Sequence, residues 1–208
     1  MKPLVVLVEG NSEKWLDDFI HQLLTRKLPD APQVQTVNMG GKDSYLKEVA
    51  ARVQRYAAQE IALAMFGLLD LYRFADNLKG FDYSPNSTVA EKVGQAREHV
   101  VSKIAPQFRS QFHQHFAVHE FEAYLLSDPK VFNSIDISDL TDEPEAVNFD
   151  SPPSRRLIQR YEAIGREYRK QTMARFLLPK VDPTLVYEKC LYFRAMIDEM
   201  IETVSQAK

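Results

Sequence analysis

The apolar positions near the start of the chain form a short uninterrupted block that is followed by a helical pattern. Residues 4–8 read Leu-Val-Val-Leu-Val, and a continuous run of this kind is typical of a strand buried on both faces. Beyond Glu9 and Gly10, with Ser12 as a candidate N-cap, apolar side chains recur on one helical face up to Pro29. The pattern predicts a strand, a loop and a helix.

The same alternation continues through the first half of the chain. Residues 33–37 are a second candidate strand, and a helix that begins at Asp43 or Ser44 follows. The apolar run 61–69 is interpreted as a third strand from its place in the alternation, although its alanines also fit a helix. The polar stretch 72–86 indicates a surface loop. Strands and helices in this order predict right-handed crossovers and a mainly parallel sheet.

The second half of the sequence is mainly helical. A helix over 89–104 is followed by a fourth candidate strand at 112–118, and the composition of 119–126 favours another helix. The last third ends in apolar residues at helical spacing. We therefore expect an α/β fold with about four strands flanked by helices. Residues 1–128 would form the core, and 129–208 a helical C-terminal extension packed on it.

Composition narrows the class of protein. A chain of 208 residues with 45% apolar side chains suits one domain, with or without a small helical appendage. It has no apolar run of about eighteen residues, and its first apolar block meets Glu9 too early for a signal peptide. The single cysteine, Cys190, excludes an internal disulfide framework and suits a packing role in a reducing compartment. We expect a cytoplasmic protein that does not span a membrane.

Two carboxylates follow predicted strands. Glu9 comes directly after the first strand and Asp70 directly after the third. In open α/β sheets, ligands bind at the edge formed by the carboxyl ends of the strands. Two carboxylates at neighbouring strand ends could hold Mg²⁺, which prefers oxygen ligands and also binds phosphate. The alternative is that each is a charged strand end that reaches solvent.

Several short motifs, taken together with their order and spacing, resemble a known group of proteins. They are V-E-G at 8–10, G-G-K at 40–42, D-L-Y at 70–72, H-E-F-E-A at 119–123, and Asn148 followed by P-S-R-R-L at 153–157. The chain resembles the Toprim-like proteins, in particular a bacterial family of unknown function. The resemblance covers most of the chain and implies a Toprim-like fold.

The resemblance also implies roles for individual residues. Glu9 would act as general acid or base, and Asp70 would help to bind Mg²⁺ or Mn²⁺. The parent fold usually carries a second aspartate two positions later, where this chain has Tyr72. The nearest replacements are Glu120 and Glu122, which share a face if the segment is a strand.

If the segment that contains these two acids is a helix, His119 and Glu122 are neighbours instead. His119 is then a further candidate for a catalytic group, or a hydrogen-bonded structural residue. The simpler interpretation of the H-E-F-E run is the start of an amphipathic helix, where the helix dipole favours acidic side chains.

Other residues are candidates for phosphate binding. Gly41 and Lys42 precede a helix and could present backbone N–H groups and an ammonium to a phosphate, or could form an ordinary turn. Ser154 and Arg155 could form a second clamp, because guanidinium groups bind oxyanions in a bidentate manner, or could belong to a solvated helix start.

Two further patterns have both a functional and a structural interpretation. A basic segment over 166–175, with Tyr161 and Tyr168 nearby, could follow a strand of nucleic acid or could be one exposed helix face. His113 and His115 face the same side of a strand, which suits zinc ligands, but the sequence near them offers no third ligand. We therefore do not expect a zinc site there.

Two main function classes remain, beside a weaker third, which is phosphotransfer or phosphohydrolase activity on a small molecule. The first is a Toprim-like subunit that cleaves phosphodiester bonds in DNA or RNA with Mg²⁺ or Mn²⁺. The resemblance implies that it works beside an ABC-type ATPase in phage or mobile-element defence. The second is a catalytically silent module that binds a partner or nucleic acid, which Tyr72 in place of an aspartate favours. The net charge of −3 is compatible with both, and the sequence leaves open whether the chain forms a homo-oligomer.

Overall fold

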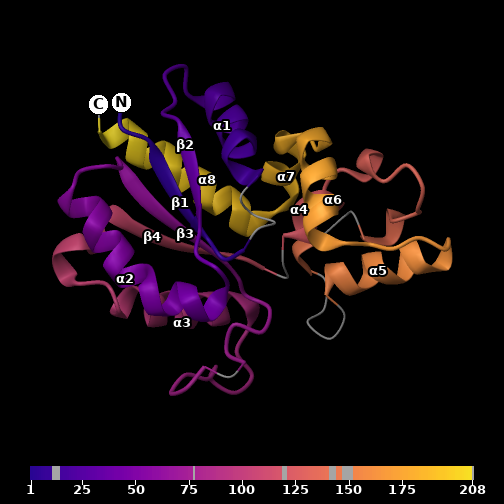
Figure 1. Ribbon diagram of the computed structural model, residues 1–208, viewed down its shortest axis with the longest axis horizontal. Helices are drawn as coiled ribbons and strands as arrows, with labels where there is room; N and C mark the ends of the chain where they lie inside the picture. The colour runs from indigo at the N-terminus through magenta and orange to yellow at the C-terminus, as the bar shows by residue number, and fades with distance from the viewer. Residues whose placement is uncertain (11–14, 77, 119–120, 141–143, 147–151, 208) are drawn as a thin grey trace.

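The computed structural model describes residues 1–10, 15–76, 78–118, 121–140, 144–146 and 152–207. Its first half alternates strands with helices, and its second half is mainly helical (Figure 1). In chain order the elements are β1 (Leu4–Val8), α1 (Leu16–Lys27), β2 (Val34–Asn38), α2 (Lys42–Ala58), β3 (Ala64–Asp70), α3 (Val89–Ser102), β4 (Phe112–Ala117), α4 (Glu122–Leu126), α5 (Pro153–Ala163), α6 (Lys170–Leu177), α7 (Pro183–Lys189) and α8 (Leu191–Gln206).

The four strands form one parallel sheet in the order β2-β1-β3-β4. This confirms the predicted α/β class and the helical C-terminal part. The apolar run before Asp70 is a strand and not a helix, and it pairs with β1 on one side and β4 on the other. Because all four strands run the same way, their carboxyl ends meet at one edge, which points toward α4 and α6 (Figure 1).

Both faces of the sheet are buried, as the continuous apolar run of β1 requires. Side chains at alternate positions of β1 enter two separate clusters, with Leu4, Val6 and Val8 in one and Val5 and Leu7 in the other. Helices α1 and α8 contribute to the first cluster, and α2 and α3 contribute to the second. The sheet is therefore the middle layer of three.

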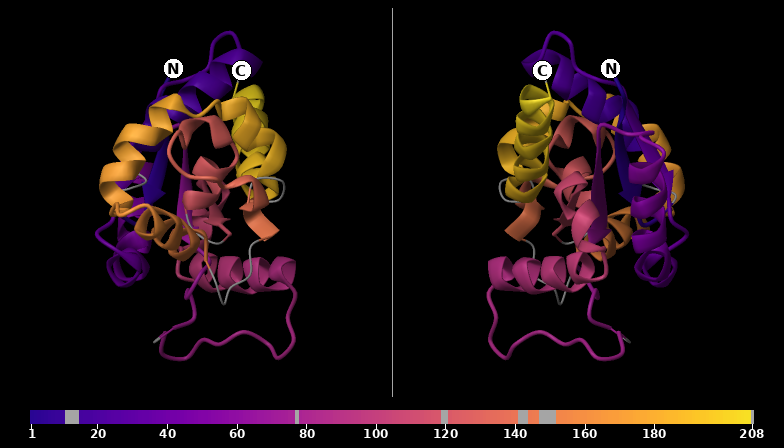
Figure 2. Two further views of the ribbon diagram at one scale, coloured as in Figure 1. Left: turned by 90° about the vertical axis from the view of Figure 1, so that its right-hand side faces the viewer. Right: turned by 90° about the vertical axis from the view of Figure 1, so that its left-hand side faces the viewer.

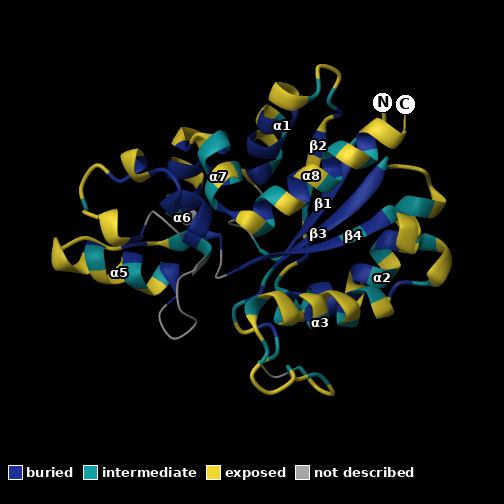
Figure 3. Cartoon of the chain, turned by 180° about the vertical axis from the view of Figure 1, so that it is seen from behind, coloured by how far each residue is buried: buried dark blue, intermediate teal, exposed yellow. Residues whose placement is uncertain are grey.

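The outer faces of the helices are exposed, while β1, β3 and β4 are mostly buried (Figure 3). Among the helices that the structure describes, none has both the length and the apolar composition needed to cross a membrane.

The C-terminal helix returns to the sheet and packs against β4. Val204, near the end of α8, belongs to the same buried cluster as Leu4 of β1. Cys190, just before α8, is fully buried with its Sγ 3.2 Å from Oγ of Ser127, and burial raises the pKa of its thiol. Segments on both sides of residue 128 thus share one core. A division into 1–128 and 129–208 stays a prediction.

Helix starts differ in detail from the expectations. Helix α2 begins at Lys42, because Gly41 takes the N-cap position with a φ of 104° that other residues rarely adopt. Helix α1 begins at Leu16, and the expected cap Ser12 lies outside the described residues. Helix α4 begins at Glu122, shorter at its start than the expected helix.

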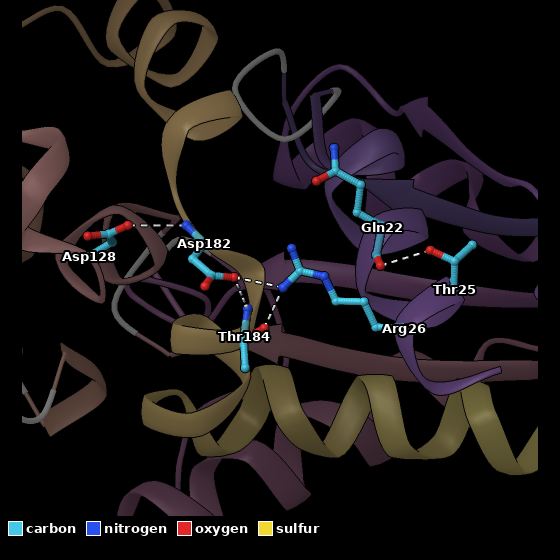
Figure 4. Close-up of polar contacts among 6 residues, drawn as sticks. All are labelled: Gln22, Thr25, Arg26, Asp128, Asp182 and Thr184. Atoms are coloured by element: carbon cyan, nitrogen blue, oxygen red, sulfur yellow. Dashed lines mark hydrogen bonds and ion pairs between the residues drawn. The ribbon is translucent and has the colours of Figure 1, made fainter. Parts of the chain in front are cut away.

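Helix α1 is tied to the segment around α7 by a polar cluster (Figure 4). The Arg26 guanidinium donates to Oδ1 of Asp182 at 2.9 Å and to Oγ1 of Thr184 at 2.6 Å. The backbone N–H of Asp182 donates in turn to Oδ2 of Asp128 at 3.2 Å. These bonds link three distant parts of the chain on the side of the sheet covered by α1.

The polar stretch after β3 is a long surface connection, as expected, and it extends away from the rest of the molecule below α3 (Figure 2). It ends at Thr88, which forms a reciprocal capping box with Glu91 at the start of α3. The cap fixes where this connection becomes helical.

Candidate metal and phosphate site

The candidate site lies at the carboxyl edge of the sheet. Asp70 is the last residue of β3, and Glu9 follows β1, which is the neighbouring strand. The register pairs Val8 with Leu68, so the chain reaches Glu9 beside the end of β3. Both acidic residues are partly buried. The sheet thus places the two predicted carboxylates at one edge.

Asp70 shares a cation with Glu122, the first residue of α4. The Lys170 ammonium nitrogen lies 3.4 Å from Oδ2 of Asp70 and 3.3 Å from Oε2 of Glu122. Lys170 begins α6, so three elements that are distant in sequence meet at this point. The structure therefore brings together two of the predicted metal ligands and adds a positive charge between them.

Burial makes the pairing of Glu122 necessary. Its side chain is fully buried, and a buried carboxylate is costly unless it is paired and hydrogen-bonded. Besides the contact with Lys170, Oε1 of Glu122 accepts a hydrogen bond from the Tyr168 hydroxyl at 3.2 Å. The segment at the start of α6 thus supplies both a charge and a hydrogen bond to this carboxylate.

The two carboxylates have the chemistry of a Mg²⁺ site. The lysine ammonium stands between Asp70 and Glu122, which shows that both oxygens face a common position for a positive charge. Mg²⁺ is usually held by one or two carboxylates together with water and substrate phosphate. No cluster of three His, Cys, Asp or Glu side chains suited to a metal occurs among the described residues. These two residues would therefore be a partial set of ligands that a phosphate completes.

Lys42 is engaged in a different contact. Its ammonium donates to three backbone carbonyls of the segment after β3, at 2.9 Å to Arg73, 3.2 Å to Phe74 and 2.7 Å to Asp76. The N–H of Gly41 donates to the Glu9 carbonyl at 2.6 Å. Phosphate binding by Lys42 or by this N–H would require these bonds to break. In the structure the G-G-K turn fixes the loops around the site.

Two of the remaining predicted residues, Ser154 and Arg155, belong to another element than Asp70. Ser154 and Arg155 lie in the first turn of α5, which packs against α4, and Arg155 is exposed. Their contact with a phosphate stays a prediction. His119 and Glu120 lie outside the described residues.

The histidine pair on β4 has a carboxylate partner that sequence spacing did not reveal. Glu199 of α8 places Oε1 2.7 Å from Nδ1 of His113 and Oε2 2.7 Å from Nε2 of His115. These hydrogen bonds hold the pKa of Glu199 well below its usual range. Burial lowers the pKa of His115, although Glu199 opposes this effect. The contacts of Glu199 with the two histidines connect α8 to β4, the edge strand.

We expect Glu199→Gln to make stability more sensitive to mild acid. A histidine with a lowered pKa binds its proton more readily in the unfolded chain, so stability falls as pH drops below about 6.5. Without the carboxylate, the pKa of His115 falls further and this loss grows. Between pH 7 and pH 5 the variant should lose about 1 kcal/mol, or about 3 °C in Tm, more than the unmodified chain. Thermal unfolding at both pH values measures it, and equal losses would contradict the proposed role of Glu199.

Sequence reasoning missed the partners of the acidic residues. It placed Lys170 and Tyr168 in a basic aromatic segment that could follow a strand of nucleic acid or form one exposed helix face. Their contacts with Glu122 depend on how α6 packs against α4, for which the sequence near them carries no local signal.

One family model matches most of the chain. It is described as a domain of unknown function, DUF4276, and it matches residues 8–201. No significant match was found among curated proteins or among solved structures.

Proposed function

Because the chain belongs to the DUF4276 family of domains of unknown function, we propose its activity from its own site: Mg²⁺-dependent cleavage of phosphodiester bonds in nucleic acid by a Toprim-like subunit. One observation carries the proposal. Asp70 and Glu122 converge on a single cationic group at the carboxyl edge of a parallel sheet. Ligands of open α/β sheets bind at this edge.

In this proposal each group near the sheet edge has a distinct task. Asp70 and Glu122 hold the metal ion, which when bound would polarise a phosphodiester and activate water. Glu9, which follows the neighbouring strand, would act as general base toward the attacking water or as general acid toward the leaving oxygen. Lys170 neutralises the two carboxylates when no metal ion is bound. When a metal ion is bound, Lys170 would face the substrate phosphate.

A direct test is cleavage of labelled single- and double-stranded DNA and RNA by the purified protein with Mg²⁺, Mn²⁺ or EDTA. We expect cleavage with either metal, and a loss of about a hundredfold or more in Asp70→Asn and Glu122→Gln, because even outer-shell partners of a metal contribute about 10- to 100-fold. Glu60→Gln is the matched control, since Glu60 is an exposed carboxylate paired with Lys2 at the opposite edge of the sheet. Cleavage that survives both site substitutions would remove this site from consideration.

A second candidate is a catalytically silent module that binds a partner or nucleic acid. Two observations favour it: Tyr72 stands where a second aspartate is usual, and Lys170 already neutralises the two carboxylates. In that case the same assay would show no metal-dependent cleavage of any substrate. Calorimetry would also show no Mg²⁺ binding that depends on Asp70.

A further inference from the structure

A hollow beside the candidate site combines apolar walls with polar groups. It lies between α1 and the chain that follows α6, with a volume of about 120 Å³. A single water needs only about 10–15 Å³ by a comparable measure, so the hollow has room for a larger group. Its walls include Trp15, Asp18, Phe19, Gln22, Leu178 and Val181.

Trp15 is the aromatic residue of this hollow that is open to solvent. The residue is 36% exposed, so part of the ring can be reached from solvent. The guanidinium carbon of Arg175, an exposed residue of α6, lies 5.6 Å from the centre of the ring. An aromatic face and a positive charge thus stand together on the surface.

The hollow also offers hydrogen-bonding groups. Asp18 and Gln22 lie one turn apart on α1 and both line it. The Gln22 side chain points away from the polar cluster around Arg26 and Asp182 (Figure 4). The Gln22 amide and the Asp18 carboxylate can together bind hydrogen-bond donors and acceptors of a ligand. An apolar peptide side chain in the hollow would leave both of these groups without a partner.

The tyrosines of the basic segment cannot provide a stacking surface. Tyr161 and Tyr168 are only 6% and 7% exposed, and their rings pack against each other with centroids 5.6 Å apart. One basic residue of α6, Arg175, lies beside the exposed tryptophan instead. Trp15 comes from the start of α1, a part of the chain that the basic segment does not include.

Helix α6 contacts both the candidate site and the tryptophan of the hollow. Lys170, which contacts Asp70 and Glu122, and Arg175, which contacts Trp15, are on the same helix. Five residues of helix span about 7.5 Å along its axis. The two basic side chains leave α6 on different sides, so a strand whose phosphate lies at Lys170 would have to cross the helix to reach the tryptophan.

We propose that Trp15 and the adjoining hollow bind an unpaired nucleobase of a single-stranded substrate, with Arg175 facing its phosphate. The occupant is inferred from charge and chemistry, because a nucleotide combines a π face for Trp15, hydrogen-bonding edges for Asp18 and Gln22, and a negative charge for Arg175. This subsite rests on the proposed function, since it assigns the substrate class of the same site. Stacking on Trp15 would select single strands over duplexes, whose bases are already stacked.

The tryptophan itself reports the test, because it is the only one in the chain. In EDTA, where metal-dependent cleavage cannot occur, short oligothymidylate and oligouridylate are titrated while Trp15 emission is recorded. We expect quenching, with about tenfold weaker binding of an oligomer of abasic sites that carries the same phosphates. Absence of quenching at saturation, or equal affinity for the abasic oligomer, would overturn the proposal.

Variants distinguish the contribution of base binding from that of phosphate binding. Trp15→Ala should weaken binding of a fluorescein-labelled oligothymidylate about tenfold, and Trp15→Phe should restore most of it. Arg175→Ala keeps the reporter and should weaken the abasic and base-bearing oligomers alike. Leu191→Ala, which removes an exposed apolar side chain at the start of α8, is the matched control and should bind normally. Tm values of all variants show whether they fold.

Failure of the base subsite and failure of the nuclease proposal give different results. Quenching in EDTA without cleavage in Mg²⁺ would support the base subsite and contradict the proposed activity. Cleavage in Mg²⁺ without quenching in EDTA would support the proposed activity and contradict the base subsite. Asp70→Asn should abolish cleavage, while oligothymidylate at saturating concentration should still quench Trp15 emission.

Discussion

Replacing Lys170 with methionine is expected to lower the free energy of unfolding by about 3 kcal/mol, equivalent to about 8 °C in Tm. The cause is the fully buried Glu122 carboxylate, which loses the cation 3.3 Å away. Removing one partner of a buried pair usually costs about 3–5 kcal/mol, and the lower end applies because Lys170 is 32% exposed. Urea unfolding followed by circular dichroism measures the change.

A double-mutant cycle identifies the origin of this loss. Adding Glu122→Gln to Lys170→Met removes the unpaired charge, so the double variant should recover part of the stability. Lys2→Met is the matched control, because it breaks an exposed ion pair with Glu60 and should cost less than about 0.5 kcal/mol. A loss in Lys170→Met no larger than in this control would show that the ammonium does not neutralise the site.

The same variant connects stability to metal binding. If Asp70 and Glu122 hold Mg²⁺, the ion should stabilise Lys170→Met more than the unmodified chain, because it replaces the missing ammonium. A rise in Tm with Mg²⁺ that depends on Asp70 would support the proposed site. Equal Tm values with Mg²⁺ and EDTA in both proteins would support the silent module.

The order of strands and helices was predictable because its signals are local. A run such as residues 4–8 is apolar at every position, and a short strand covered on both faces buries all of it. A single turn residue before each strand or helix then sets the boundary to within a few positions, as Gly41 does at α2. The parallel direction follows from the helices between strands.

The partners of the site residues were not predictable in this way. Asp70 and Lys170 are separated by 100 positions, and their contact depends on the packing of α6 against α4. The interpretation of the basic aromatic segment was also ambiguous, since Tyr168 could face solvent or the core, and it contacts the buried Glu122. Helical spacing fixes a face of a helix but not what that face meets.

Gly67 in β3 is another residue whose role depends on packing and not on local sequence. The residues next to it in sequence give no reason for a glycine in a central strand. A Cβ atom at this position would overlap the hydroxyl of Tyr45 and the side-chain oxygen of Gln114. These two groups share a buried hydrogen bond of 2.8 Å that passes over the strand, and burial raises the pKa of the Tyr45 phenol. The glycine leaves room for this bond.

Gly67→Ala is therefore expected to lower the free energy of unfolding by about 3 kcal/mol, since the methyl group both overpacks the core and separates a buried polar pair. Gly94→Ala is the matched control: Gly94 lies in α3 with no atom near its Cβ position, and alanine there should raise stability by about 0.5–1 kcal/mol. Urea unfolding compares the two. Tyr45→Phe combined with Gly67→Ala removes one of the two overlapping atoms and should recover part of the loss. A stable Gly67→Ala protein would show that Tyr45 and Gln114 can move apart at little cost.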